Sequence, residues 1–341
     1  MRSILSLALL ATSLTAPSLS AMAQDVTLRV HHFMPGSSTL PSLMLAPWEE
    51  AVEAASDGRI DIEIFHAMSL GGTPPGLYDQ AVDGAVDIIL TLPGYTPGRF
   101  PSIEVFELPF FVSDTVASSG ALYDMIEQDL ADSEFEEAKI LAAWTHGPGV
   151  LHTKTPVTRL EDLQGLELRG PTRLSTRTLA ELGATPVGLP LPAIPENLSK
   201  GVIDGAVVPW EITPAIRLQE LAGNHLEIGS DPALYTATFI LAMNWEAYEA
   251  MPEDLQAILD AESGKALSLL TGQIVLDADD TSKAIVEASG ASISTLSSED
   301  AAQWAAAATP VTAGWIAEVA DLGLDGAALI ARAQELMAAN M

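Results

Sequence analysis

The sequence contains no cysteine, and its 341 residues include only 15 lysines and arginines against 46 aspartates and glutamates. Without cysteine the chain forms no disulfide and no thiolate metal site, so its stability must come from packing in a large core. The formal net charge is −31, and no basic patch long enough to follow a phosphate backbone is visible. We therefore expect neither nucleic acid nor an anionic bilayer surface as a partner.

Long apolar runs are also lacking, apart from one short stretch at the N-terminus. Arg2 precedes an apolar run over residues 4–14, and Ala21-Met22-Ala23 has the small-residue pattern of a cleavage site. A membrane-spanning helix needs about 20 apolar residues, so this run is too short. We expect residues 1–23 to be a cleaved export signal, which removes Arg2 and changes the net charge from −31 to −32. The mature protein is predicted to be periplasmic, with no lipid anchor.

The length and patterning of the remaining chain predict an α/β protein with two lobes. Residues 24–341 are more than one hydrophobic core usually serves. The step Asp-Gly-Ala-Val occurs at residues 83–86 and again at 204–207, as two related lobes would show. We expect a periplasmic-binding-protein-like clamshell with mainly parallel or mixed sheets and long C-terminal helices. Lobe 1 would occupy mainly residues 24–145, lobe 2 mainly 146–243, and a helical region that braces both lobes 244–341.

Alternation and apolar periodicity locate the individual elements. The expected strands are 28–33, 60–64, 86–92, 140–144, 150–152, 166–169, 187–189 and 206–209, with 234–244 crossing between the lobes. The expected helices are 41–55, 77–82, 252–289 and 298–339. In the first helix the predicted buried stripe is Leu43, Leu45, Trp48, Val52 and Ala55.

Arg169 is the main candidate for binding a ligand. It follows a short apolar strand and precedes Gly170-Pro171, so its side chain can point into a cleft. The planar guanidinium can give two parallel hydrogen bonds to a carboxylate. Three further arginines, Arg159, Arg173 and Arg177, lie close by in the sequence. For any one of them the alternative is a salt bridge that only supports the structure.

Other candidate residues lie where predicted strands end, because ligands of open α/β sheets bind beyond the carboxyl ends of the strands. Adjacent His31 and His32 point to opposite faces of a strand, and we favour His32 for the cleft. The alternative for His32 is a hydrogen-bonded structural histidine, and for Trp210 and Phe239 it is core packing. The predicted ligand-binding set is Arg169, His32, Phe33, Tyr95, Leu92, His152, Trp210 and Phe239, and His146 also follows a strand.

Several ordered motifs resemble those of the DctP-type substrate-binding proteins of TRAP transporters. They read Gly165-Leu-Glu-Leu-Arg169, Leu182-Gly-Ala-Thr-Pro186 and Gly201-Val-Ile-Asp-Gly205, preceded by Ser69-Leu-Gly-Gly72 and Phe106-Glu-Leu-Pro-Phe-Phe111 and followed by Met243-Asn-Trp245. Any one motif would be weak, but the ordered set covers most of the chain after residue 25. The resemblance implies capture of a small organic acid by closure of the two lobes. The ligand would then be delivered to TRAP membrane subunits.

Departures from the family pattern narrow the expected ligand. Relatives that bind polyhydroxylated sugar acids carry polar residues near the positions of Leu92 and Val208, and often a second arginine before the strand that ends at Arg169. Here these places read Leu92, Val208 and the stretch Val150-Leu151-His152, and unpaired buried polar groups would be costly. We expect a monocarboxylate with an apolar or aromatic body, or a 2-oxo acid. A C4-dicarboxylate or a sugar acid is the alternative, and no metal or other cofactor is expected.

An enzyme is the main rival class. The sequence contains no G-x-S-x-G elbow, no H-E-x-x-H, no phosphate-binding G-x-x-x-x-G-K-[ST] and no G-x-G-x-x-G after a strand. We therefore expect a binding protein. A receptor domain that reports its ligand to a sensor would have the same fold and site, and a homodimer formed through the C-terminal helices stays open.

Overall fold

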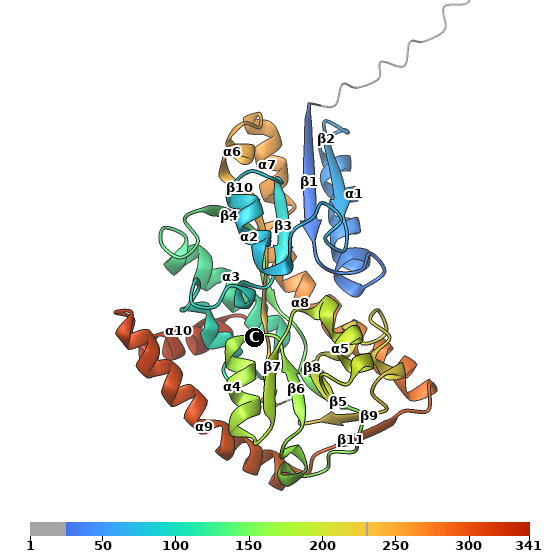
Figure 1. Ribbon diagram of the computed structural model, residues 1–341. Coiled ribbons are helices and arrows are strands. Elements are labelled where there is room, and N and C mark those ends of the chain that lie inside the picture. Colours follow the sequence, from blue (N-terminus) through green and yellow to red (C-terminus); the bar gives the residue numbers. More distant parts are fainter. Residues whose placement is uncertain (1–24, 230) are drawn as a thin grey trace, which may run out of the picture.

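The structure, a computed structural model, describes residues 25–229 and 231–341, which form two lobes each built around one sheet (Figure 1). The predicted export signal, residues 1–23, lies outside the described residues. In the described part of the chain, no helix is long and apolar enough to span a bilayer.

The sheet of the first lobe has five strands. Their order is β2 (Ile60–Phe65), β1 (Val26–His32), β3 (Ile88–Thr91), β10 (Thr238–Asn244) and β4 (Ala138–Thr145). The sheet of the second lobe has six, in the order β11 (Ser292–Thr295), β9 (Asn224–Glu227), β5 (Val150–Thr153), β8 (Gly205–Val208), β6 (Glu167–Gly170) and β7 (Thr185–Gly188). Both sheets are mixed, because antiparallel pairs follow the parallel ones in each.

The two sheets share one succession of pairings. In the first, β2, β1 and β3 are parallel to one another. β10 is then antiparallel to β3, and β4 is antiparallel to β10. In the second, β7, β6 and β8 are parallel to one another. β5 is then antiparallel to β8, and β9 is antiparallel to β5. The strand predicted over 234–244 is β10, which lies wholly in the first sheet. The chain therefore crosses between the lobes before residue 238.

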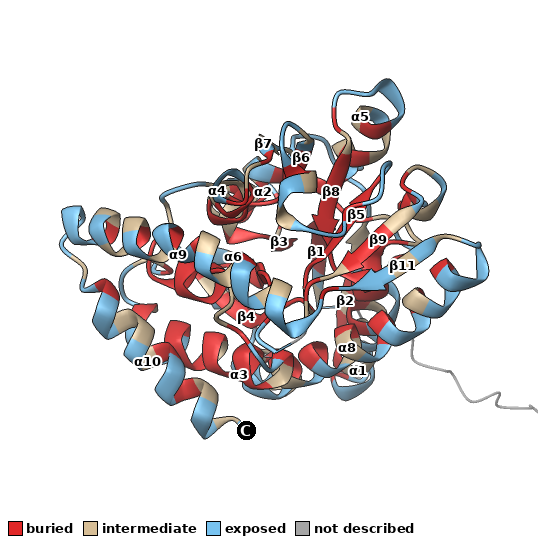
Figure 2. Ribbon diagram, turned by 90° about the horizontal axis from the view of Figure 1, so that it is seen from below, coloured by how far each residue is buried: buried red, intermediate tan, exposed pale blue. Residues whose placement is uncertain are grey.

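Helices cover both sheets and fill the space beside the lobe boundary. They are α1 (Ala46–Ala55), α2 (Leu77–Val82), α3 (Thr115–Met125), α4 (Arg173–Glu181), α5 (Ile194–Lys200), α6 (Trp245–Glu249), α7 (Glu253–Ala261), α8 (Gly264–Ala288), α9 (Ser298–Asp321) and α10 (Gly326–Ala339). Figure 2 shows that most of them bury one face and expose the other, whereas α3 is buried nearly all round. Helix α8 contacts α3 and β4 of the first lobe and the short turn Trp210–Ile212 of the second. Helix α9 packs on α4, and α10 on α3.

Two details of the predicted helices are wrong. The helix expected over 41–55 begins as a π-helix, Leu40–Leu45, whose wider turn changes which residues face inward. Leu43 is therefore 52% exposed, whereas Met44 is buried with Leu45, Trp48 and Val52. Ala55, at the end of α1, is also exposed. The helices expected over 252–289 and 298–339 are each divided in two. The breaks coincide with Gly264 and Gly323, which have φ of +75° and +84°.

Candidate functional site

A small, mainly apolar cavity of about 30 Å³ lies between the two sheets. Side chains from both lobes line it: Phe33, Met34, Leu92, Tyr95, His146, Arg169, Pro171, Leu191, Val208, Pro209, Glu211, Ile212, Tyr235, Ala237 and Phe239. Five of these residues directly follow a strand: Phe33, Leu92, His146, Pro171 and Pro209. The cavity therefore has the position in which α/β proteins bind ligands, beyond the strand ends.

Arg169 is held at this cavity by the strands around it. Its strand, β6, is paired on both sides, with β7 and β8. The guanidinium donates from Nε to the carbonyl oxygen of Leu189 at 2.8 Å and from Nη1 to that of Val207 at 3.1 Å. These two bonds use two of the five N–H groups of the guanidinium, so donors remain for a carboxylate. The side chain is thus fixed in orientation before any ligand arrives.

The charge of Arg169 is buried without an acidic partner. Its exposed fraction is 2%, and among the described residues no carboxylate lies within 4.0 Å of it. Burial lowers the pKa of Arg169, and Tyr95 and Tyr235 oppose that shift. The neighbouring arginines behave differently, since Arg173 pairs with Glu104 and Glu318 and Arg177 with Glu318. An unpaired buried cation is costly, and an anionic ligand would remove that cost.

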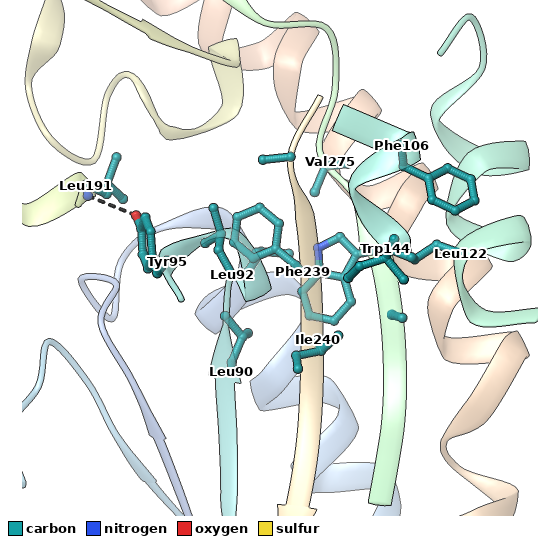
Figure 3. Packing of buried hydrophobic residues seen from close by; sticks show 14 of the residues in the cluster. Leu90, Leu92, Tyr95, Phe106, Leu122, Trp144, Leu191, Phe239, Ile240 and Val275 are labelled. Carbon is teal, nitrogen blue, oxygen red and sulfur yellow. Dashed lines mark hydrogen bonds between the residues drawn. The ribbon is translucent and has the colours of Figure 1, made fainter. Parts of the chain in front are cut away.

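The rest of the cavity wall is mainly apolar and aromatic. The rings of Phe33 and Tyr95 pack edge to face with centroids 5.4 Å apart. Phe239, on β10, stacks on the buried Trp144 of β4 with centroids 5.7 Å apart, and Leu92 lies beside it (Figure 3). A planar apolar ligand would make dispersion contacts with this wall but few hydrogen bonds.

Direct contacts close the lobes over the cavity. The backbone N–H of Leu191 in the second lobe donates to the hydroxyl of Tyr95 in the first at 3.0 Å, as Figure 3 shows. The hydroxyl of Thr39 donates to the carbonyl oxygen of Glu211 at 3.2 Å. Gly94 approaches Thr172 so closely that a Cβ atom would lie 2.5 Å from the Thr172 methyl carbon. The described arrangement is therefore a closed one.

Three polar side chains complete the lining: His146, Glu211 and Tyr235. Burial lowers the pKa of His146 to about 4 and raises that of Glu211 to about 7. Beside Glu211, burial and then the charge of Glu211 raise the pKa of Asp279 to about 8. Asp279 accepts a hydrogen bond from the backbone N–H of Glu211 at 2.6 Å.

Five of the eight predicted ligand-binding residues line the cavity: Arg169, Phe33, Tyr95, Leu92 and Phe239. The remaining three lie elsewhere. His32 Nε2 is 2.9 Å from Nδ1 of His66, and its Nδ1 accepts from the N–H of Met34. His152 Nδ1 is 2.6 Å from Nδ1 of His225, and Trp210 donates to Glu227 at 3.0 Å. Each of these rings is therefore engaged away from the cavity.

Sequence reasoning missed Glu211 and Tyr235. After β8 the chain enters a 3₁₀ turn, Trp210–Ile212, which directs Trp210 toward Glu227 and brings Glu211 and Ile212 to the cavity. The expectation that ligand-binding residues follow strand ends therefore identified the correct turn, but it selected Trp210 instead of Glu211 and Ile212. Tyr235 lies in the segment between β9 and β10, and its ring covers Gly149, where a Cβ atom would be 2.0 Å from a ring carbon. No sequence signal marks it.

Four of the six histidines form two pairs, His32 with His66 and His152 with His225. Over the described ranges, no group of three or more histidine, aspartate or glutamate side chains is placed to hold a metal ion.

The fold and cavity define the class of this protein: two lobes joined by crossing segments, closed over a site with one buried cation. The chain belongs to the DctP family, since the model of the bacterial extracellular solute-binding proteins, family 7, matches residues 31–318. It is a TRAP transporter solute-binding protein. Proteins of this class bind small organic acids and deliver them to membrane subunits, and they are periplasmic or otherwise extracytoplasmic.

Solved structures of related proteins superimpose over nearly their whole length. A TRAP solute-binding protein from Rhodoferax ferrireducens T118, in complex with copurified benzoate, is 44% identical with a TM-score of 0.90, covering 92% of this chain and 98% of its own. A marine metagenome TRAP solute-binding protein specific for aromatic acid ligands, in complex with 3-hydroxybenzoate, is 41% identical with a TM-score of 0.91, covering 93% and 99%. The C4-dicarboxylate-binding periplasmic protein DctP of Rhodobacter capsulatus is 24% identical, covering 88% and 90%.

Proposed function

We propose that this protein captures a small monocarboxylate with an aromatic or other apolar body in the periplasm and delivers it to TRAP membrane subunits. Arg169 binds the carboxylate, and Phe33, Leu92, Tyr95 and Phe239 surround the apolar body. The observation that carries the proposal is the buried guanidinium without an acidic partner in a mainly apolar cavity. Benzoate and 3-hydroxybenzoate in the two structural relatives support the same ligand class.

The composition of the cavity argues against the other ligands of the family. Arg169 is the only lysine or arginine among the residues that line it, so a second carboxylate would be buried without a cation. A sugar acid would bring several hydroxyl groups to walls that offer few hydrogen-bonding partners. A single-ring monocarboxylic acid matches both the one cation and the mainly apolar walls.

Isothermal titration calorimetry on the mature protein tests this proposal. Purification should include partial unfolding and refolding, so that a copurified ligand is removed. Benzoate, phenylacetate and phenylpyruvate represent the proposed class, whereas succinate and galacturonate represent the alternatives. We expect at least one aryl acid to bind at least about tenfold more tightly than either alternative. Tight binding of succinate or galacturonate, with none of the aryl acids, would overturn the proposal.

A further inference from the structure

Three buried polar atoms that belong to residues lining the cavity have no hydrogen-bond partner in the described part of the protein. They are Nε2 of His146, Oε2 of Glu211 and the hydroxyl of Tyr235. The three residues are 4%, 4% and 2% exposed. Because an unpaired buried polar atom is costly, each is a candidate for a partner on the ligand.

The protonation of His146 follows from its neighbour. Nδ1 lies within hydrogen-bond distance of the carbonyl oxygen of Gly147. A carbonyl oxygen only accepts, so the hydrogen atom is on Nδ1. Since the ring is neutral at physiological pH, as its lowered pKa indicates, Nε2 carries a lone pair and accepts a hydrogen bond.

Packing fixes the His146 ring in this orientation. It meets the ring of Tyr235 edge to face with centroids 5.1 Å apart, and that of Phe239 at 6.4 Å. The backbone N–H of His146 donates to the carbonyl oxygen of Ala237 at 3.3 Å. The acceptor is thus held in place before a ligand binds, as a specificity group must be.

A ligand carboxylate can satisfy Arg169 and Tyr235 but not His146. Carboxylate oxygens accept hydrogen bonds, which suits the guanidinium and a phenolic O–H. They carry no hydrogen atom for Nε2 of His146. The parent aryl acids would therefore leave this acceptor buried and unpaired, whereas a hydroxyl group on the ligand would satisfy it.

We propose that His146 accepts a hydrogen bond from a hydroxyl group of the ligand, so that the site selects hydroxylated aromatic monocarboxylates over their parent acids. This inference rests on the proposed function, because it concerns the same cavity and the same carboxylate site. In this site His146 is a specificity-determining residue that recognises the hydroxyl group of the ligand, and Arg169 binds its carboxylate.

The test is a ratio of affinities measured by calorimetry. Benzoate is compared with 2-, 3- and 4-hydroxybenzoate, and the preferred isomer is compared with its methyl ether, which keeps the oxygen but cannot donate. We expect the preferred isomer to bind about tenfold to a hundredfold more tightly than benzoate, since one buried acceptor gains a partner. The methyl ether should bind no more tightly than benzoate. A natural protein that binds benzoate and every hydroxybenzoate equally would overturn the inference.

Variants assign the preference to one side chain. His146→Phe keeps an aromatic ring but removes the acceptor, so the ratio should fall to about one. His146→Gln restores an acceptor and should recover part of it. Tyr248→Phe removes a polar atom from an aromatic ring outside the cavity and is the control. If the preference survives in His146→Phe, His146 is not the acceptor. Loss of that surviving preference in Glu211→Gln would assign it to Glu211 instead.

The two proposals fail in different ways. If the proposed function is wrong, neither benzoate nor any hydroxybenzoate binds to the natural protein. If only the role of His146 is wrong, these acids bind and depend on Arg169, but the ratio is one or does not respond to His146→Phe.

Discussion

The ends of the two sheets offer a direct comparison, because the same succession of strands supplies opposite chemistry. In the first lobe, β1 and β3 lead into Phe33, Leu92 and Tyr95, which are aromatic or apolar. In the second, β6 ends with Arg169 and Gly170, and β8 leads into Glu211. One lobe therefore presents a charge, and the other presents a mainly apolar wall that includes His146 after β4.

This division explains why binding and closure belong together. A ligand shifts the equilibrium between open and closed states only through contacts that one state has and the other lacks. An aryl acid held by Arg169 alone would leave its ring in water. The ring loses that contact with water only when the first lobe covers it, so closure adds binding free energy.

The largest effect is expected for Arg169→Ala. Loss of the guanidinium leaves the ligand carboxylate buried without a cation, which should cost about 2 to 5 kcal/mol of binding free energy. Arg169→Lys should recover little of this, because lysine lacks the planar pair of donors. Calorimetry with the best aryl acid measures both. Arg177→Ala is the matched control, since Arg177 pairs with Glu318 outside the cavity, and unchanged affinity in Arg169→Ala would remove Arg169 from the site.

Gly94→Ala should weaken binding from the side of the first lobe. The new Cβ atom would lie 2.5 Å from the Thr172 methyl carbon across the lobe boundary. Such overpacking typically costs about 1 to 3 kcal/mol, and opening the lobes relieves it. Affinity should therefore fall about fivefold to a hundredfold, while the Tm of the ligand-free protein changes little.

Two further variants isolate this contact. Thr172→Ser in the Gly94→Ala background removes the methyl group and keeps the hydroxyl that caps α4, so it should restore part of the affinity. Gly76→Ala, where the nearest atom to a Cβ is 3.9 Å away, should have no effect. If Gly94→Ala binds like the natural protein, the lobes are not as closely packed in the bound state as they are here.

Tyr95→Phe should have a smaller effect, because it leaves the ring and removes only the hydroxyl, which accepts from Leu191 and interacts with Arg169. The N–H of Leu191 then loses its partner at 3.0 Å. A neutral hydrogen bond contributes about 0.5 to 1.5 kcal/mol, so affinity should fall about two- to tenfold, mainly through faster ligand release. Stopped-flow fluorescence separates the two rate constants. Tyr248→Phe, which removes a bond to the exposed Asp260, serves as the control, and equal release rates in all three proteins would contradict the role of Tyr95 in closure.

The sequence predicted the strands and the position of Arg169 better than the identity of its neighbours. Strand ends can be located because apolar runs stop at residues such as Gly170 and Pro93. Which side chain then faces the cavity depends on the turn that follows the strand. In the 3₁₀ turn after β8, Glu211 faces the cavity and Trp210 does not. His32 illustrates a second limit, since its partner His66 lies on a different segment and only folding brings the two rings together.

The π-helix that begins at Leu40 shows the same kind of limit in a helix. Periodicity assumes 3.6 residues per turn, and the wider turn exposes Leu43 in place of Met44. Tyr235 is the extreme case, because a residue outside any regular element is placed only by tertiary contacts. Local patterns therefore predict where a site forms, and long-range packing decides which residues compose it.

The smallest effect concerns two buried acids beside the charged lobe, Glu211 and Asp279. Burial, and then the charge of Glu211, raise the pKa of Asp279 to about 8, far above its value in an unfolded chain. The folded protein then binds a proton that the unfolded chain has released. The contribution of Asp279 to stability therefore falls as the pH rises between about 4 and 8.

Asp279→Asn removes this titration and keeps an oxygen that can accept from the N–H of Glu211. We expect the Tm of the natural protein to fall more between pH 6 and pH 9 than that of the variant, by a few degrees. Glu211, Glu227 and Asp280 act on Asp279 and remain in the variant, so part of the fall should persist. Asp277→Asn, an exposed acid on the same helix, should follow the natural protein. Parallel Tm curves for the natural protein and Asp279→Asn would mean that Asp279 ionises normally, and that the charged lobe tolerates a carboxylate beside Glu211 at no cost.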